Sequence, residues 1–277
     1  MKERAYAKVN LALDVFNVRQ DGYHDLRSIM VPINFYDELE IRISDKDEFY
    51  CDKEYVKSNP NNSILMMIEE FKSKFNIDDH YYVKLHKCIP SQAGLGGGTS
   101  DAAAALRILK KLYHLNLSKQ EERDLCVAVG ADVLFNYYNK AAVVSGIGDV
   151  VEPFRMKKIY SILLVKPRLG VSTKQAYENL DMEKCDHPDV DKLKIALEEG
   201  KDIKGLLGNS LEQPSLILNK DVKIIKDLLI ANGANNVLMS GSGSTVFAIS
   251  ENYEEIATLN NIVKKQQYFT RFTQTLY

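Results

Sequence analysis

The chain has 277 residues, which suits one large domain or two ordinary ones and allows a sizeable core. Hydrophobic residues make up 45% and charged residues 27% of the sequence, which excludes disordered and fibrous classes. With 36 Lys and Arg against 38 Asp and Glu, the net charge of −2 gives no reason to expect a nucleic-acid or anionic-membrane partner.

The sequence carries no signal for membrane insertion or export. No apolar run approaches the roughly 20 residues that span a bilayer, and residues 1–8 lack the apolar core of a signal peptide. The four cysteines form no C-x-x-C pair and the five histidines form no H-E-x-x-H motif. We therefore expect a cytoplasmic protein with no structural disulfide and no histidine or cysteine metal site.

Two stretches near the N-terminus alternate between apolar and polar side chains, as strands do. They are residues 9–15 and residues 39–43, and Asp21-Gly22 between them predicts a turn. Residues 58–62 have the composition of a loop. Residues 63–75 carry apolar side chains at helical spacing, which predicts a helix.

The middle of the chain predicts a short strand, a glycine-rich loop and two helices. The strand covers residues 81–85, and the loop, called the glycine-rich loop below, covers residues 90–98. The first helix follows the loop and ends near Tyr113, and the second covers residues 118–129.

The rest of the chain mixes strands and helices without a regular β–α alternation, which favours an α+β fold over a doubly wound sheet. A domain junction is expected at residues 156–158, because a new apolar strand follows; this gives domains of residues 1–156 and 157–277. The expected elements are strands at residues 141–144, 160–166, 237–239 and 245–249 and a helix at residues 223–231.

The glycine-rich loop is the strongest local signal for chemistry. Four glycines in five positions let the backbone approach a ligand closely, and the helix that follows offers free N–H groups and a favourable dipole to phosphate. Thr99 and Ser100 add hydroxyl groups. The ordinary alternative is a structural loop capped by Ser100 or Asp101. The spacing fits neither the Walker A motif nor the dinucleotide-binding G-x-G-x-x-G motif.

Three further segments are candidates for a site. Lys8 and Asn10 lie on the same face of a strand, although a lone lysine is ordinarily solvated. Asp132 lies among small and apolar residues after a helix, where burial would raise its pKa unless a cation such as Lys8 offset it; otherwise it is a turn or capping residue. Residues 240–244, Ser-Gly-Ser-Gly-Ser and called the serine loop below, predict a hairpin connection or a lid over a bound phosphate.

In their order along the chain these segments resemble the GHMP kinase superfamily. Within it, the finer resemblance is to the 4-diphosphocytidyl-2-C-methyl-D-erythritol kinases of the methylerythritol phosphate route to isoprenoid precursors. The finer match rests on residues 8–11, 21–26, 130–133 and 166–173. The resemblance implies a two-domain α+β fold, with an N-terminal domain like ribosomal protein S5 and a ferredoxin-like C-terminal domain. It covers residues 5–250.

The resemblance also implies the roles of individual residues. It assigns Asp132 as the catalytic base, with Lys8 beside it, and ATP with Mg²⁺ as the cofactors, and it leaves the residues that hold Mg²⁺ open. The residues implied for ATP are Asn62, Lys87, Pro90, Gly94, Leu95, Gly96, Gly97, Gly98, Thr99 and Ser100. The residues implied for a cytidine diphosphate methylerythritol substrate are Asn10, Tyr23, His24, Asp132, Thr173 and Tyr177. Tyr23 and Tyr177 would stack on the cytosine and His24 would bond its edge.

The sequence departs from the family pattern without losing a residue that carries an assigned role. Leu134 replaces proline, Ser210 replaces aspartate, and residues 139–140 replace a Gly-Gly pair. In the glycine-rich segment, Thr99 and Asp101 stand for serine and asparagine. We expect these changes to affect loop geometry more than activity.

Two other functions fit the sequence less well. The first is a GHMP kinase for homoserine, mevalonate or a sugar. These small substrates carry no base on which an aromatic side chain could stack, so residues 21–24 argue against this function. A catalytically silent ATP-binding relative has no chemical need of both Lys8 and Asp132. Small molecules are thus the expected partners, with no nucleic acid and no membrane, and the chain is expected to be a monomer or a weak homodimer.

Overall fold

The computed structural model describes residues 1–57 and 59–276 and divides into two compact units. The expected α+β fold is confirmed, since each unit combines strands with helices. The glycine-rich loop belongs to both units, because Ser91–Leu95 lies in the second and Gly96 begins a segment of the first. The first unit is Met1–Ala7, Phe35–Pro90 and Gly96–Asn139; the second is Lys8–Asn34, Ser91–Leu95 and Lys140–Tyr277.

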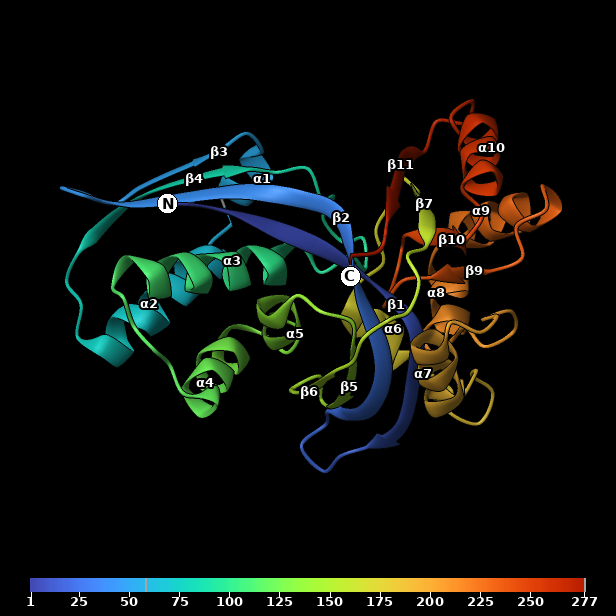
Figure 1. Ribbon diagram of the computed structural model, residues 1–277, viewed down its shortest axis with the longest axis horizontal. Coiled ribbons are helices and arrows are strands. Elements are labelled where there is room, and N and C mark those ends of the chain that lie inside the picture. The colour runs from blue at the N-terminus through green and yellow to red at the C-terminus, as the bar shows by residue number, and fades with distance from the viewer. Residues whose placement is uncertain (58, 277) are drawn as a thin grey trace. The chain divides into compact units, whose positions relative to one another are not determined.

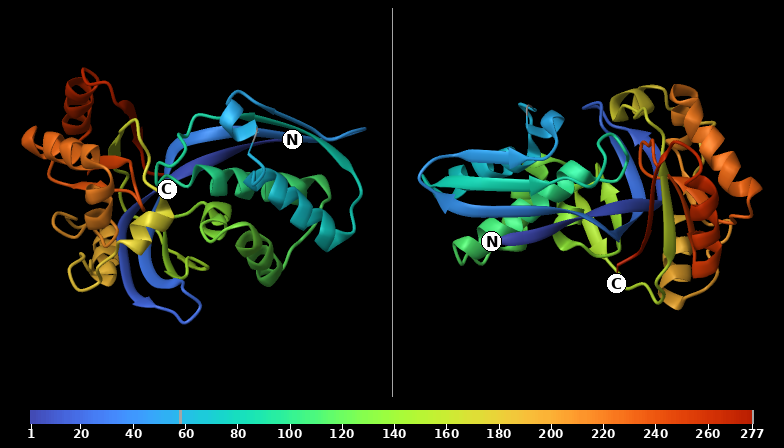
Figure 2. Two further views of the ribbon diagram at one scale, coloured as in Figure 1. Left: turned by 180° about the vertical axis from the view of Figure 1, so that it is seen from behind. Right: turned by 90° about the horizontal axis from the view of Figure 1, so that it is seen from above.

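In the first unit, helices pack on one face of a group of strands (Figures 1 and 2). Strand β4 pairs antiparallel with the later part of β2, from Glu38 with His86 to Ser44 with His80, and parallel with β3. The strands are the start of β1 (Lys2–Val18), the later part of β2 (His24–Ser44), β3 (Glu48–Cys51) and β4 (His80–His86). The helices are α1 (Glu54–Lys57), α2 (Ser63–Phe75), α3 (Gly97–Leu112), α4 (Lys119–Val129) and α5 (Val133–Tyr138).

Local sequence explains where α2 and α4 begin. The Asn62 side chain caps α2 by accepting hydrogen bonds from the backbone N–H groups of Ile64 and Leu65. Ser118 and Glu121 form a reciprocal capping box at the start of α4. The helix expected at residues 63–75 is confirmed, whereas the loop expected just before it includes residue 58, which lies outside the described residues.

The second unit contains the rest of β1 and β2 and a separate four-stranded sheet in the order β11-β7-β10-β9. Residues 26–30 of β2 pair antiparallel with β5, and Ala12 of β1 pairs parallel with Gly208 of β8. The further strands are β5 (Ala142–Gly146), β6 (Val150–Pro153), β7 (Ser161–Lys166), β8 (Gly208–Asn209), β9 (Val237–Met239), β10 (Val246–Ser250) and β11 (Phe269–Gln274). The helices are α6 (Thr173–Glu178), α7 (Val190–Glu199), α8 (Glu212–Leu218), α9 (Lys220–Ala231) and α10 (Tyr253–Val263).

The core of the second unit lies between the four-stranded sheet and helices α9 and α10 (Figure 1). Leu163 and Val165 of β7 point into it, because they occupy alternate positions of a strand. From the helices it receives Val222, Ile225, Leu229, Ile256, Leu259 and Val263. This packing fixes the end of β9, where the serine loop begins.

Two features differ from the sequence-based expectations. Alternation predicted a strand with one polar face at residues 9–15. However, Asn10 and Ala12 are as buried as Val9 and Leu11 on the other face of the strand. Both faces of β1 are covered here, so its polar side chains need partners inside the protein. The glycine-rich loop is also shorter than expected, because α3 already begins at Gly97.

Candidate active site

The first unit contributes the start of α3. Gly96 occupies the N-cap position with φ 68°, a left-handed conformation that glycine adopts without strain, and Gly97 and Gly98 form the first turn. The first N–H groups of a helix have no partner within the helix, and the helix dipole makes this end positive. The segment therefore has the construction of a phosphate site.

The hydroxyl groups after the glycines are held at the same helix start. Thr99 donates to the carbonyl of Gly96 and Ser100 to that of Gly97, each at 3.0 Å. The Asn136 side chain of α5 donates to the Thr99 hydroxyl at 2.9 Å. Helix α5 is thereby fixed against the start of α3.

Asp132 lies at the N-terminal end of that same helix α5. Its backbone carbonyl accepts the hydrogen bond from Asn136, and its side chain is half-buried. A Cβ on nearby Gly130 would lie 3.5 Å from the Thr99 methyl carbon. Within the first unit, the structure thus brings the Asp132 segment together with the predicted ATP residues Thr99 and Ser100.

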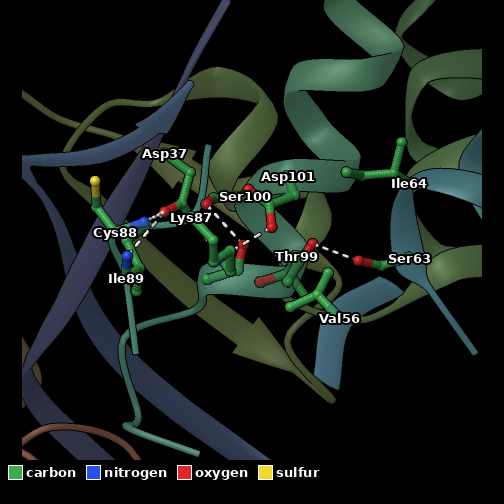
Figure 3. A network of polar contacts seen from close by, with 12 residues as sticks. Asp37, Val56, Ser63, Ile64, Lys87, Cys88, Ile89, Thr99, Ser100 and Asp101 are labelled. Carbon is green, nitrogen blue, oxygen red and sulfur yellow. Dashed lines mark hydrogen bonds and ion pairs between the residues drawn. The ribbon is translucent and has the colours of Figure 1, made fainter. Parts of the chain in front are cut away.

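The predicted nucleoside residue Asn62 also serves the fold. Besides capping α2, its amide donates to the carbonyl of Val56 at 3.3 Å. Next to it, Ser63 donates to the carbonyl of Gly98 at 2.7 Å (Figure 3). Helix α2 is therefore hydrogen-bonded directly to the first turn of α3.

Lys87 is buried between two carboxylates, Asp37 of β2 and Asp101 of α3 (Figure 3). Its Nζ pairs with Asp37 Oδ2 and lies 2.9 Å from Asp101 Oδ2. The other Asp37 oxygen accepts from the backbone N–H groups of Cys88 and Ile89 at 2.5 and 2.8 Å. A Cβ on Gly97 would lie 3.0 Å from Nζ. The ammonium group therefore lies directly against the first residue of α3.

Burial and charge act in opposite directions on this group of three. Burial raises the pKa of Asp101 well above its usual range, and the charge of Lys87 offsets only part of this. Burial lowers the pKa of Lys87, but the charges of Asp101 and Asp37 outweigh it and leave that pKa raised. The Oδ1 atom of Asp101 is buried without a hydrogen-bond partner within the described residues. Burial thus favours the protonated form of Asp101 relative to an exposed aspartate, while the Lys87 ammonium group pairs with Asp37.

The second unit contributes Lys8 and Asn10, only 4% and 1% exposed. Lys8 Nζ donates to Asn10 Oδ1 at 2.6 Å, so the expectation that both occupy one face of the strand is confirmed. The Asn10 amide donates to the Ser28 hydroxyl at 2.9 Å, and Ser28 donates to the carbonyl of Ala12 at 2.6 Å. Lys8 is thus buried and hydrogen-bonded, unlike an ordinary solvated lysine.

The first part of the glycine-rich loop packs against the same strand. The backbone N–H of Lys8 donates to the carbonyl of Leu95 at 3.0 Å, and the carbonyl of Gly94 accepts from the Ser240 hydroxyl at 2.9 Å. Pro90 is half-buried and ends the preceding segment of the first unit. Gly94 and Leu95 are therefore brought beside Lys8 and Asn10.

The alternative of a lid at the serine loop is wrong, because residues 240–244 are all buried and tied down by hydrogen bonds. The Ser242 carbonyl accepts from Ser215 at 3.0 Å, and the Ser244 hydroxyl donates to the carbonyl of Leu169 at 2.9 Å. The backbone N–H of Ser244 donates to Gln92 of the glycine-rich loop at 3.4 Å. The serine loop is a fixed connection in the second unit.

The predicted substrate residues Tyr23, His24, Thr173 and Tyr177 lie in the second unit outside β1. The rings of His24 and Tyr177 have centroids 4.9 Å apart at an interplanar angle of 42°. Thr173, the first residue of α6, shares a hydrogen bond of 2.8 Å with the Ser242 hydroxyl. Tyr23 is 61% exposed. An aromatic surface of Tyr177 and His24 thus exists in the second unit, while stacking by Tyr23 stays a prediction.

Sequence reasoning missed several residues that hold these groups in place. The role of Asp37 could have been suspected from the sequence. It is an acid in a largely apolar part of β2, and a buried acid requires a partner inside the protein. The others, Ser28, Asn136 and Ser240, are small polar residues of ordinary appearance. Their partners lie 18, 37 and 146 residues away along the chain, so no local pattern reveals them.

Comparison with known proteins shows the family of the chain. The N-terminal domain of the GHMP kinases matches residues 62–151, and their C-terminal domain matches residues 182–268. A curated 4-diphosphocytidyl-2-C-methyl-D-erythritol kinase from Lachnoclostridium phytofermentans is 38% identical, covering 98% of this chain and 97% of the relative. The chain belongs to this family of GHMP kinases. A kinase of the same name from Bacillus cereus is also 38% identical, covering 94% of this chain and 92% of its own.

Solved structures support membership of the GHMP kinases. A crystal structure of a 4-(cytidine 5'-diphospho)-2C-methyl-D-erythritol kinase matches with a TM-score of 0.84 and 28% identity, covering 99% of both chains. The phosphomevalonate kinase of Streptococcus pneumoniae, at 15% identity and a TM-score of 0.72, shares the fold.

The domain boundary at residue 156 stays a prediction. Within residues 1–57 and 59–276, every helix is too short or too polar to cross a lipid bilayer.

Proposed function

We propose that the protein transfers the γ-phosphoryl group of ATP to the 2-hydroxyl of 4-diphosphocytidyl-2-C-methyl-D-erythritol. The observation that carries the proposal is the start of α3, where a glycine run on a left-handed N-cap precedes Thr99 and Ser100. In a chain of this kinase family, such a helix start is suited to the phosphates of ATP. The kinase names of the relatives at 38% identity support the acceptor.

We propose that both backbone and side-chain groups bind ATP. The N–H groups of residues 94–98 would bind the phosphates, with the hydroxyls of Thr99 and Ser100 beside them. Asn62, Pro90 and the backbone of Lys87 would meet the nucleoside. Since the Lys87 ammonium is paired with Asp37 and Asp101, its side chain is assigned to holding the glycine-rich loop.

The reaction itself asks mainly for alignment and charge stabilisation. We propose that Asp132 accepts the proton of the acceptor hydroxyl while its oxygen attacks the γ-phosphorus and ADP leaves. Lys8 would stabilise the negative charge of the group in transit. Its fixed position on Asn10 supports this role, because a held ammonium loses little freedom when the phosphate arrives.

On the acceptor side, a flat neutral base suits the aromatic residues of the second unit. We propose that Tyr23 and Tyr177 stack on the cytosine and that His24 bonds its edge. Asn10 and Thr173 would hold the polar part of the substrate. The packing of His24 on Tyr177 supports the proposal, because it limits the motion of both rings before binding.

Mg²⁺ fits this arrangement as an ion carried by the phosphates. Among the described residues no group of three or more His, Cys, Asp or Glu side chains forms a metal cage, and Mg²⁺ typically binds phosphates and water with one or two protein oxygens. Thr99 and Ser100 at the start of α3 and Asp132 at the start of α5 supply suitable oxygens. When bound, the ion neutralises phosphate charge.

We also propose that the protein acts in the cytoplasm, as a monomer or weak homodimer. The four cysteines are scattered along the sequence without a C-x-x-C pair, which supports a reducing compartment. Sedimentation over a range of concentrations tests the oligomeric state.

The experiment that tests the function is ADP release by the purified protein with ATP, Mg²⁺ and one acceptor at a time. The acceptors are 4-diphosphocytidyl-2-C-methyl-D-erythritol, homoserine, mevalonate and galactose. We expect turnover with the first alone. Turnover with another acceptor instead would contradict the assignment of the cytosine site but would still support the ATP site. ATP binding without any turnover would make the protein a silent relative.

A further inference from the structure

The serine loop is held at its beginning by one buried amide, that of Asn209 in β8. The side chain is 1% exposed. Its Nδ2 donates to the carbonyls of Met239 and Gly241, both at 2.8 Å, and its Oδ1 accepts from the backbone N–H of Leu211 at 2.9 Å. Both amide hydrogens and the amide oxygen are therefore engaged, which leaves the side chain a single orientation.

The residue that Asn209 fixes packs directly on the Lys8–Asn10 pair. Gly241 has φ 56°, and a Cβ there would lie 3.2 Å from Lys8 Nζ and 3.4 Å from Asn10 Oδ1. A side chain at residue 241 would crowd both groups, and the glycine leaves open the space that the ammonium group faces. A displacement of residue 241 would therefore change the surroundings of Lys8.

The neighbouring residue links the same segment to the glycine-rich loop. Ser240, between the two carbonyls that Asn209 binds, donates from its hydroxyl to Gly94 at 2.9 Å. The same hydroxyl lies 3.4 Å from the backbone N–H of Asn10, which donates to it. A shift of residues 239–241 would therefore move contacts to both Lys8 and Gly94.

We propose that Asn209 is a positioning residue for phosphoryl transfer. Its amide holds residues 239–241, and through them sets Lys8 relative to the first part of the glycine-rich loop. The proposal rests on the proposed role of Lys8. Because misplacement of a reacting group by about 1 Å costs on the order of 100-fold in rate, loss of the amide should lower kcat far more than it changes the KM for the acceptor.

The test compares Asn209→Asp, Asn209→Ala and wild type at a temperature where each is folded by circular dichroism. Asn209→Asp has the same shape and keeps the acceptor for Leu211, but its ionised form turns an oxygen toward two carbonyls. We expect kcat of both variants to fall about 10- to 100-fold at pH 8. For Asn209→Asp alone, kcat relative to wild type should rise several-fold toward pH 5.5, because a protonated carboxyl again donates one hydrogen bond.

The matched control is Asn219→Ala, which also removes a buried amide of the second unit. Asn219 donates to the carbonyl of Leu169 and caps α9, so its loss costs stability without touching Gly241. We expect it to keep kcat within about threefold of wild type. Folded Asn209 variants with normal kcat, an equal loss in Asn219→Ala, or an Asn209→Asp ratio that does not change with pH would each overturn the proposal.

Lys8→Met, measured in parallel, separates this proposal from the proposed function. Normal turnover of Lys8→Met would contradict the proposed role of Lys8 and, with it, the positioning role of Asn209. A low turnover of Lys8→Met together with normal Asn209 variants would overturn the positioning role alone.

Discussion

Gly94 meets the carbonyl of Ser240 so closely that a Cβ on residue 94 would lie 1.9 Å from the carbonyl oxygen. No side chain fits at that distance, and φ of 70° further favours glycine. The contact brings the beginning of the glycine-rich loop onto the serine loop, where the Ser240 hydroxyl also binds Gly94. This glycine is required by packing, independently of any phosphate.

Gly94→Ala is therefore expected to be strongly destabilising. The added carbon forces the two loops apart, and the left-handed conformation adds its own penalty, so the free energy of unfolding should fall by about 3 kcal/mol or more. Urea unfolding measures the change. Gly205→Ala is the control, because Gly205 has φ 73° but nothing within 4 Å of an added Cβ. It should cost about 1–2 kcal/mol, and an equal cost at both sites would contradict the packing argument.

Asp132→Asn tests the base. The amide keeps the size of the side chain but cannot accept the hydroxyl proton, so kcat should fall roughly 10²- to 10⁴-fold with a modest change in KM for both substrates. Steady-state kinetics with saturating ATP check this. The control Asp221→Asn changes a half-buried acid in the first turn of α9 and should leave kcat unchanged. Near-normal turnover of Asp132→Asn would remove the residue from the base role.

Elements defined by local patterns could be predicted from the sequence. The helix at residues 63–75 has a regular apolar face and an asparagine cap, and the strand at residues 237–239 is a short apolar run before a loop. Helix α5 was not expected, because its 6 residues follow Asp132 after only a short break. Strand β11 was missed because its alternation is mixed, and pairing with β7 fixes it.

The site was predictable as motifs but not as a set of contacts. Lys8 and Asn10 share a face by strand periodicity, and the glycine run from Gly96 leads into a helix by composition. The Lys87 pairing with Asp37 joins residues 50 positions apart, and Asn209 reaches Gly241 across 32. Such contacts depend on the tertiary fold, which local periodicity does not encode.

Tyr177→Ala tests the aromatic surface for the acceptor. Removal of the ring eliminates a stacking face and its contact with His24, so the acceptor KM should rise about 10-fold while the KM for ATP stays within twofold. Tyr253→Ala is the control, since Tyr253 packs on Phe272 elsewhere in the second unit. An unchanged acceptor KM in Tyr177→Ala would contradict the stacking assignment.

Asp101 gives the protein a dependence of stability on pH that an asparagine would remove. Its pKa in the folded protein lies well above its usual range because of burial, whereas in the unfolded chain it is ordinary, about 3.9. Between these two pKa values the folded protein binds more protons than the unfolded chain, so stability falls as pH rises. Each unit of pKa difference corresponds to about 1.4 kcal/mol, present at low pH and lost as pH passes the folded pKa.

Asp101→Asn should therefore gain stability relative to wild type as the pH rises from 5.5 to 8.5. The asparagine carries no charge to bury, and Lys87 keeps its partner Asp37. Urea unfolding at several pH values measures the difference between the two proteins, which should grow with pH until the pH passes the pKa of Asp101 in the folded protein. Asp191→Asn is the control, since this exposed acid pairs with Arg27 at the surface and its lowered pKa places its titration below pH 5.5. A difference for Asp101→Asn that is constant with pH would mean that Asp101 is already ionised throughout this range, with Lys87 balancing both carboxylates.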